Sequence, residues 1–237
     1  MQAIVTLQEV VREYSQGTVT LRALQGIDLS IHRGEFVAVA GPSGSGKTTL
    51  LNVMSGLDRP TSGTIIVDGQ DLGAMNHSRL SRLRLERIGF VFQAYNLLPV
   101  LTAYENAEYV LLMQGLGARQ RRERVMHMLE RVGLKGLEKR FPRELSGGQQ
   151  QRVAVARAMA AEPALVLADE PTANLDSHSA AELMDLMREL NGEKNMTFVF
   201  STHDRSVMRR AARLVVLKDG AIARDGGPEG LDGDAGA

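Results

Sequence analysis

The sequence contains no cysteine and no tryptophan among its 237 residues, and aromatic residues make up only 4% of it. The absence of cysteine excludes disulfide bonds and thiolate metal sites, and it fits a reducing compartment. No apolar run approaches the roughly 20 residues that a membrane-spanning helix needs, and the N-terminus lacks the layout of a signal peptide. Any role at a membrane is therefore expected to depend on a partner.

The chain also lacks a charge excess of either sign. Lysine plus arginine and aspartate plus glutamate each number 28, so no overall field favours nucleic acid or general adsorption to a membrane. Hydrophobic residues make up 43% of the chain and charged residues 24%, which is ordinary for a globular protein with one large core. We therefore predict one domain that carries a subdomain.

What the sequence does contain is the pattern G-x-x-x-x-G-K-[ST] at residues 41–48, directly after the apolar run 36–40. A glycine-rich surface turn is the alternative, but an apolar strand before the pattern and an apolar helix after it supply the context of a phosphate-binding loop. Lys47 is then expected to reach the β- and γ-phosphates, and Thr48 to offer its hydroxyl to Mg²⁺. The predicted phosphate-binding residues are Gly41, Pro42, Ser43, Gly44, Ser45, Gly46, Lys47, Thr48 and Thr49.

A second apolar run, residues 164–168, ends in two acids, Asp169 and Glu170. Such a run predicts a fully buried strand of a parallel sheet, and carboxylates at its end are unfavourable there unless they have a use. Asp169 can join a Mg²⁺ shell, and Glu170 can accept a proton from an attacking water. Farther on, Asp176 or Ser177 is predicted to cap a helix.

Three further residues carry weaker signals when each is taken alone. Gln93 follows the strand pattern of residues 88–92, where its carbonyl oxygen could ligate Mg²⁺ and orient water, although a lone glutamine is more often a loop hydrogen-bonder. His203 ends another strand pattern and could contact a γ-phosphate, against the alternative of a satisfied loop histidine. Tyr14 offers a ring face to adenine, against the alternative of a half-buried strand tyrosine.

Residues from about 102 to 160 are predicted to be helical. Thr102 with Glu105 has the spacing of a capping box, as does Ser146 with Gln149 inside the run L-S-G-G-Q at residues 145–149. The two glycines of that run, Gly147 and Gly148, leave backbone amides open to an anion, although a well-capped helix is the alternative. Arginines at positions 79, 82, 84 and 87 are interpreted as a solvated amphipathic face rather than as an anion site.

In this order and spacing, the segments resemble the ATPase subunit of ABC transporters. The resemblance rests on the phosphate loop, Gln93, L-S-G-G-Q, the acid pair, N-L-D at residues 174–176 and His203, and it extends from Tyr14 to about Gly220. It implies an α/β P-loop NTPase core with a mixed or parallel sheet, an N-terminal antiparallel β subdomain and an inserted helical subdomain at about 95–160. The single domain would cover residues 1–224, and residues 225–237 would form a flexible tail.

The resemblance also implies how the residues act. Two copies would sandwich two ATP molecules, so that Ser146, Gly147, Gly148 and Gln149 of one copy contact the nucleotide held by the other. Glu170 would be the general base, assisted by His203, Gln93 and Lys47. Tyr14 would stack on adenine and Asp176 would act across the dimer. ATP and Mg²⁺ are the implied cofactors, with Thr48, Gln93 and Asp169 around the metal.

A finer resemblance comes from residues 56–63, 95–99 and 168–177, which are similar to the ATPases of lipoprotein-releasing, macrolide-efflux and cell-division systems. It implies a peripheral position on the cytoplasmic face of the inner membrane, membrane subunits with an extracytoplasmic domain, and no nucleic-acid partner. An amino-acid importer ATPase is one alternative, and a non-transport ABC ATPase acting on ribosomes or DNA is another. The substrate is not predicted, because substrate choice would reside in other chains.

Overall fold

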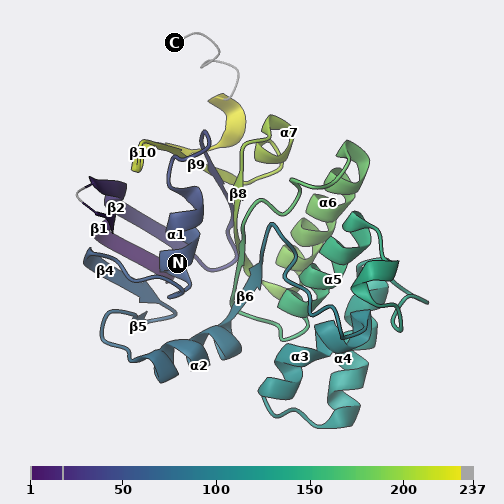
Figure 1. The fold of residues 1–237 in the computed structure, drawn as a ribbon. Coiled ribbons are helices and arrows are strands. Elements are labelled where there is room, and N and C mark those ends of the chain that lie inside the picture. The colour runs from purple at the N-terminus through teal and green to yellow at the C-terminus, as the bar shows by residue number, and fades with distance from the viewer. Residues whose placement is uncertain (1, 18, 231–237) are drawn as a thin grey trace.

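The structure, a computed structural model, describes residues 2–17 and 19–230, and two sheets organise them (Figure 1). The smaller sheet is antiparallel, with the order β2-β1-β4-β5. Its strands are β1 (Ala3–Gln16), β2 (Val19–His32), β4 (Ser62–Val67) and β5 (Gln70–Asp71). The larger sheet has the order β10-β9-β3-β8-β7-β6 and contains β3 (Phe36–Ala40), β6 (Ile88–Val91), β7 (Leu165–Ala168), β8 (Thr197–Thr202), β9 (Arg213–Lys218) and β10 (Ala221–Gly226).

The larger sheet is parallel apart from the edge strand β10. Strand β3 pairs in parallel with β8 and β9, and β7 pairs in parallel with β6 and β8. The carboxyl ends of β3, β6, β7 and β8 therefore lie along one edge of the sheet, which is where ligands bind in open α/β sheets. The residues that follow these four strands are the ones that the sequence marks as a site.

Alternating side chains of the central strands enter two different cores. Val37 and Val39 of β3 face α1 (Lys47–Met54) and the antiparallel sheet, whereas Phe36 and Ala38 face the helices on the opposite side. Figure 1 shows α1 between the two sheets, with α5 and α6 on the other face of the larger sheet. Both faces are covered, which fits the wholly apolar sequences of β3 and β7 in the middle of the sheet. The helices are α2 (His77–Arg87), α3 (Ala103–Met113), α4 (Ala118–Arg131), α5 (Gly147–Met159), α6 (Ser177–Lys194) and α7 (Arg205–Met208), with 3-10 turns η1 (Pro142–Glu144) and η2 (Pro228–Gly230).

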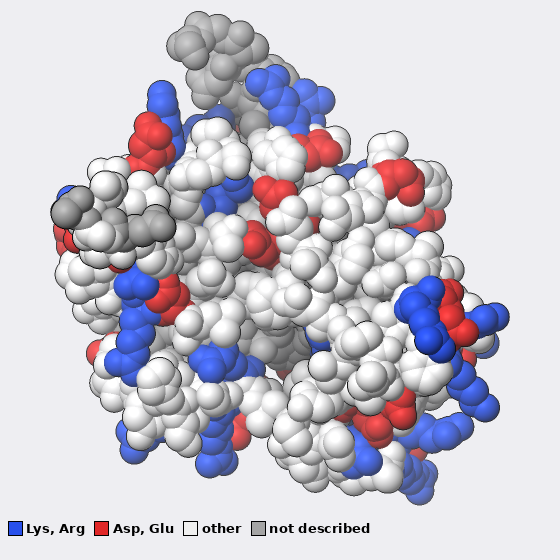
Figure 2. Space-filling model, viewed as in Figure 1, with Lys and Arg blue, Asp and Glu red and all other residues white. Residues whose placement is uncertain are grey.

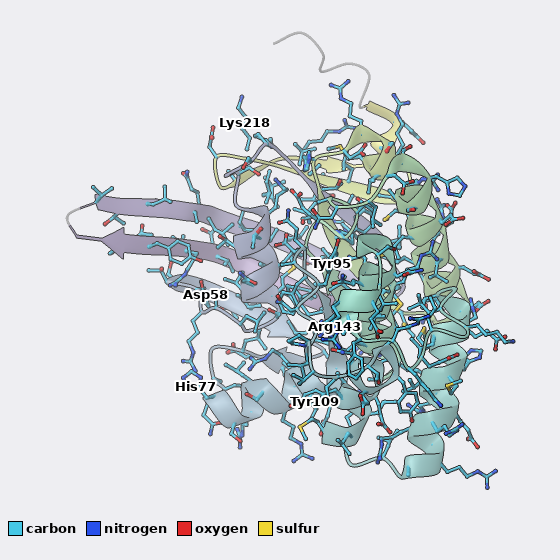
Figure 3. All side chains as sticks on the ribbon, turned by 45° about the vertical axis from the view of Figure 1, so that its right-hand side comes forward. Asp58, His77, Tyr95, Tyr109, Arg143 and Lys218 are labelled. Atoms are coloured by element: carbon cyan, nitrogen blue, oxygen red, sulfur yellow. The ribbon has the colours of Figure 1, made fainter. Side chains whose placement is uncertain are left out.

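The N-terminal hairpin is longer than its sequence pattern predicts. The pattern shows short strands at residues 4–7, 19–21 and 27–31, but β1 and β2 each run for 14 residues. Register shifts interrupt the pairing after Leu7 and around Val10, and Glu9 adopts a left-handed φ of 50°. Such bulges break the alternation of side chains, so that one strand reads as two. The outer half of the hairpin pairs only with itself and extends away from the rest of the molecule (Figure 3).

The two predicted capping boxes and the amphipathic interpretation of the arginines at 79–87 are confirmed. Thr102 and Glu105 form a capping box at the start of α3, and Ser146 and Gln149 form another at the start of α5. Helix α2 buries Leu80 and Leu83 while most of its arginines stay exposed, as the amphipathic interpretation requires. No helix in the described ranges is long and apolar enough to cross a membrane.

The C-terminal part is structured beyond the predicted boundary. Strand β10 continues to Gly226, because it pairs with β9 as far as Leu214, and η2 covers Pro228–Gly230. The expectation of a flexible tail therefore does not describe residues 225–230. Its remaining residues, 231–237, lie outside the described part of the chain.

Candidate active site

A cavity of about 780 Å³ lies at the carboxyl edge of the parallel strands, and it brings together residues from widely separated segments. Part of the cavity wall was not predicted from the sequence and comes from β2 and from the turn between β9 and β10. These residues are Leu21, Arg22, Ala23, Gln25, Asp219 and Gly220. No motif marks these residues, because only the fold places them there. The predicted residues that line the cavity are Tyr14, Ser43, Gly44, Gly46, Lys47, Thr48, Thr49, Gln93, Glu170 and His203.

The phosphate loop adopts a conformation that only glycine tolerates at two points. Gly41 has φ +151°, and a Cβ there would lie 2.3 Å from the backbone oxygen of Leu217. Gly46 has φ +103°, and a Cβ there would lie 2.6 Å from the backbone oxygen of Ala23. Both distances are below any real contact, so the glycines of the motif are required by the backbone.

Among residues 2–17 and 19–230, the loop and the start of α1 have donors without an acidic or capping partner. Helix α1 begins at Gly46 without a side-chain cap and without an acid in its first turn. The hydroxyl of Ser45 is buried and makes no hydrogen bond. Lys47 is 7% exposed, and its ammonium donates to the carbonyls of Gly41 and Pro42, 2.9 Å from each. Gly46 and Lys47 both line the cavity, and an uncapped helix start beside an ammonium without a carboxylate fits the oxygens of a polyphosphate.

The two acids after β7 are held by hydroxyl groups of strand β8 and helix α1. Asp169 Oδ1 accepts hydrogen bonds from Thr48 Oγ1 at 3.1 Å and from Ser201 Oγ at 2.7 Å. Ser201 Oγ also accepts the backbone N–H of Glu170, at 2.8 Å. Glu170 itself has a left-handed φ of 44°, which is unusual for a residue with a side chain. One buried hydroxyl therefore fixes both acids.

Thr48 and Asp169 supply the hard oxygen ligands that Mg²⁺ prefers. No group of three or more histidines and carboxylates that could hold a metal occurs in the described ranges. A site with two protein oxygens fits Mg²⁺ all the same, since this ion usually keeps waters and takes further ligands from phosphate. The residues present therefore fit the predicted metal.

Glu170 and His203 face each other at the ends of the adjacent strands β7 and β8. His203 Nδ1 lies 3.0 Å from Glu170 Oε1, and the two side chains are 65% and 18% exposed. This hydrogen bond orients the carboxylate toward the cavity that both residues line. Gln93 lines the same cavity, but β6 ends at Val91, so the residue belongs to a loop rather than to the strand end that was predicted.

Tyr14 is a strand tyrosine that also presents its ring to the cavity, so both interpretations of its sequence position fit the structure. Its hydroxyl donates to Asp58 Oδ2 at 2.7 Å, and the guanidinium of Arg12 lies 4.4 Å from its ring centroid. The side chain remains 37% exposed and lines the cavity. A strand tyrosine anchored in this way presents its ring at the mouth of the site.

Nine predicted site residues are not among those that line this cavity. Four of them lie within two positions of lining residues along the chain, namely Gly41, Pro42, Ser45 and Asp169, whereas the other five belong to different segments: Ser146, Gly147, Gly148, Gln149 and Asp176. Ser146 and Gln149 cap α5. Asp176 caps α6, and hydrogen bonds from the backbone and hydroxyl of Ser179 lower the pKa of its carboxyl below the ordinary value. Within one copy, the start of α5 and Asp176 therefore lie outside the cavity lining.

Ser201 was not among the predicted site residues, and its only sequence signal is a hydroxyl after the buried run 197–200. It is fully buried. We expect Ser201→Ala to lower the free energy of unfolding by about 1–3 kcal/mol, because two hydrogen bonds to the acid pair are lost. We also expect ATP turnover to fall by at least about tenfold, because Asp169 and Glu170 lose their common support. Chemical denaturation and steady-state ATPase assays measure the two effects.

Ser55→Ala is the matched control. Ser55 is equally buried, and its hydroxyl donates to the backbone oxygen of Asn52 at the end of α1. We expect a similar loss of stability with unchanged turnover. An equal loss of turnover in both variants would contradict the role given to Ser201.

Comparison with known proteins identifies close relatives. A family model described as ABC transporter matches residues 24–173. The lipoprotein-releasing system ATP-binding protein LolD of Legionella pneumophila (strain Lens) is 45% identical over 219 residues, which cover 92% of this chain and 96% of that protein. The macrolide export ATP-binding/permease protein MacB of Hyphomonas neptunium is 44% identical over 94% of this chain, but the match covers only 35% of that protein.

Solved structures agree with the sequence relatives. MJ0796 of Methanocaldococcus jannaschii, named an uncharacterised ABC transporter ATP-binding protein, is 43% identical over 97% of this chain. Its dimeric structure in a post-hydrolysis state, bound to ADP and Pi, matches with a TM-score of 0.90 and 41% identity. That match covers 94% of this chain and 98% of the other, so one fold accounts for nearly the whole molecule.

Proposed function

This chain belongs to the ABC transporter family, as its ATP-binding and ATP-hydrolysing subunit, and from that premise we propose that the cavity at the carboxyl edge of the larger sheet is its ATP site. The observation that carries the proposal is the convergence of Lys47, Glu170 and His203 on one cavity. Phosphate donors, a carboxylate and a histidine from three separate segments are the groups that phosphoryl transfer to water requires.

Each residue has a role that follows from its position. Lys47 exchanges its two loop carbonyls for phosphate oxygens when ATP binds, since the ammonium lies within the same loop. Glu170 accepts a proton from the water that attacks the γ-phosphorus, and its hydrogen bond to His203 keeps the carboxylate in place. Tyr14 contacts the adenine from the exposed side of its ring.

We also propose that ATP binds together with Mg²⁺, held by Thr48 and Asp169 with Gln93 nearby. The metal would supply positive charge against the phosphate oxygens. Thr48 and Asp169 are already hydrogen-bonded to each other at 3.1 Å, so the two ligands are side by side before any ion binds.

A second copy of the chain would complete the site. Ser146, Gly147, Gly148 and Gln149 do not line the cavity of their own chain, and both glycines leave the start of α5 without side chains in the way of an anion. The solved structure of MJ0796 bound to ADP and Pi is described as dimeric. These observations support an ATP-dependent dimer in which Asp176 and the start of α5 face the partner's nucleotide.

A membrane permease is the proposed partner. The relative MacB is named an ATP-binding/permease protein and is about three times as long as the matched region, so there a permease is part of the same chain. Here, five of the nine exposed large apolar side chains among the described residues belong to residues 98–100 and to α3, and charges of both signs are interspersed over the visible face (Figure 2). They are Leu98, Val100, Tyr109, Leu112 and Met113. Such a group supports docking on another protein.

We propose that this permease has an extracytoplasmic domain, as the lipoprotein-releasing and macrolide-efflux resemblance implies, and that the chain sits on the inner face of the cell membrane. ATP-driven closure of the dimer would then move the permease. The cargo, and whether anything is carried, depends on that partner.

Co-purification tests this proposal. We expect tagged Glu170→Gln protein, solubilised from membranes with ATP and Mg²⁺, to retain a membrane protein with a large extracytoplasmic domain, identified by mass spectrometry against an untagged preparation. The variant is chosen because it should hold ATP without hydrolysing it. Ribosomal or DNA-bound partners without any membrane protein would overturn the transporter assignment while leaving the ATP chemistry in place.

A further inference from the structure

The segment that carries Gln93 has no secondary structure of its own, and side chains from elsewhere hold it. We call residues 92–102, between β6 and α3, the Gln93 loop. Asn106 is 1% exposed and uses its side-chain amide to bind Leu98, Leu101 and Thr102 at the far end of the loop. Asn174 Nδ2 donates to the backbone oxygen of Gln93 at 3.1 Å.

Arg157 of α5 holds the middle of the loop. Its guanidinium donates to the backbone oxygens of Asn96, at 2.5 Å, and Tyr95, at 2.8 Å. Both acceptors have left-handed φ angles, 58° for Tyr95 and 50° for Asn96. Two consecutive non-glycine residues with left-handed φ angles have a strained backbone, and this conformation is maintained only when surrounding contacts hold it in place. Arg157 makes the two contacts that bracket this turn.

The guanidinium of Arg157 is partly buried and its hydrogen bonds go to carbonyl oxygens. The side chain is half-buried, and burial lowers the pKa of its guanidinium below the ordinary value. It forms no ion pair with any carboxylate in residues 2–17 and 19–230, so its charge is balanced only by carbonyl dipoles. Burying a charge without a counter-ion costs free energy, and an apolar side chain of similar size, such as methionine, would pack there without that cost.

The same turn also touches the start of α5. A Cβ placed on Gly147 would lie 3.1 Å from the hydroxyl of Tyr95, so this side chain lies against the first residue of the helix. Figure 3 labels Tyr95 in the middle of the molecule, next to the helices. The loop that carries Gln93 is thus bonded to α5 near the C-terminus of the helix, through Arg157, and lies beside its N-terminal residue Gly147 through the side chain of Tyr95.

We propose that Arg157 is a positioning residue for hydrolysis, which fastens the Tyr95–Asn96 turn to α5 so that Gln93 and the L-S-G-G-Q end of the helix move as one body. This inference rests on the proposed function, because it requires that Gln93 acts at the ATP site. When the N-terminus of α5 contacts the nucleotide bound by the partner copy, Gln93 would move with the helix to its working position at the ATP site of its own chain.

The first test compares Arg157→Met with wild type in steady-state ATPase assays. We expect kcat to fall about 10- to 100-fold while KM for ATP changes less than about twofold, because the binding groups stay intact and only Gln93 is misplaced. Arg157→Lys should recover part of kcat, since an ammonium can reach one of the two carbonyls. Hydrogen exchange of the peptide covering residues 92–101 should become faster in Arg157→Met.

Arg152→Met is the matched control on the same helix. Arg152 also donates to a backbone oxygen, that of Val132, and it pairs with Glu182, but neither partner belongs to the Gln93 loop. We expect this variant to leave kcat and the exchange of residues 92–101 unchanged. Equal losses of kcat in the two variants would reduce Arg157 to a general stabiliser of α5 and overturn the proposal.

A double variant separates positioning from stability. If Arg157 acts through Gln93, Arg157→Met should cause no further loss of kcat in a Gln93→Ala background. Multiplicative losses would overturn the proposal. Glu170→Gln in the same assay distinguishes failure of the proposed ATP site from failure of the positioning role. If Glu170→Gln keeps normal turnover, the proposed site itself is wrong. If Glu170→Gln loses turnover while Arg157→Met turns over normally, only the positioning role is wrong.

Discussion

Glu170→Gln is expected to lower ATP turnover by about 10²- to 10⁴-fold while ATP affinity stays near that of the wild type. The amide has the shape of the carboxylate but cannot accept a proton from water. The hydrogen bond with His203 and the one from the Glu170 backbone to Ser201 can both persist, so the site should keep its geometry. Single-turnover hydrolysis and calorimetric ATP binding measure the two quantities.

Glu162→Gln provides the control for this variant. Glu162 also has a left-handed φ, 50°, and its carboxylate pairs with Lys194, away from the cavity. It should turn over ATP at the wild-type rate. Near-normal turnover of Glu170→Gln would remove Glu170 from the role of general base.

Lys47→Ala is expected to weaken ATP binding by about 10- to 100-fold, the size of a charge-assisted hydrogen bond lost from a site. The ammonium of Lys47 has no carboxylate partner among the described ion pairs, and it is enclosed by the loop that should hold the phosphates. Isothermal titration with ATP measures the loss directly.

Lys135→Ala is the matched control, since Lys135 is an exposed lysine paired with Glu130 on α4. It should bind ATP like the wild type. Unchanged ATP affinity of Lys47→Ala, in protein whose thermal unfolding remains cooperative, would count against the phosphate-loop assignment.

The sequence predicts those parts of the site that are formed by consecutive residues. The phosphate loop needs its glycines because a Cβ at Gly41 or Gly46 would collide with the backbone, so the chemistry and the local pattern coincide. The acids after β7 follow from the contrast between a buried apolar strand and two charges. The fold class was predicted from the resemblance to ABC transporter ATPases, and that resemblance rests on the same continuous runs.

The parts that the sequence does not predict depend on contacts between distant segments. Ser201 supports the acid pair only because β8 lies beside β7, and Arg157 supports the Gln93 loop only because α5 packs beneath it. Neither residue has a local pattern that distinguishes it from an ordinary strand serine or helix arginine. The length of the N-terminal hairpin was underestimated for a different reason, since bulges at Glu9 and Val10 hide a continuous strand.

The strand order of the larger sheet has a consequence for synthesis of the chain. Strand β3, which delivers the phosphate loop, is flanked by β8 and β9, so that Phe36 pairs with Phe198 and Val37 with Arg213. A nascent chain emerging from the ribosome exposes the glycine-rich motif long before either neighbour has been made. Pairings this distant in sequence form late and slowly. The phosphate loop is therefore expected to reach its final position only after β8 and β9 have been translated.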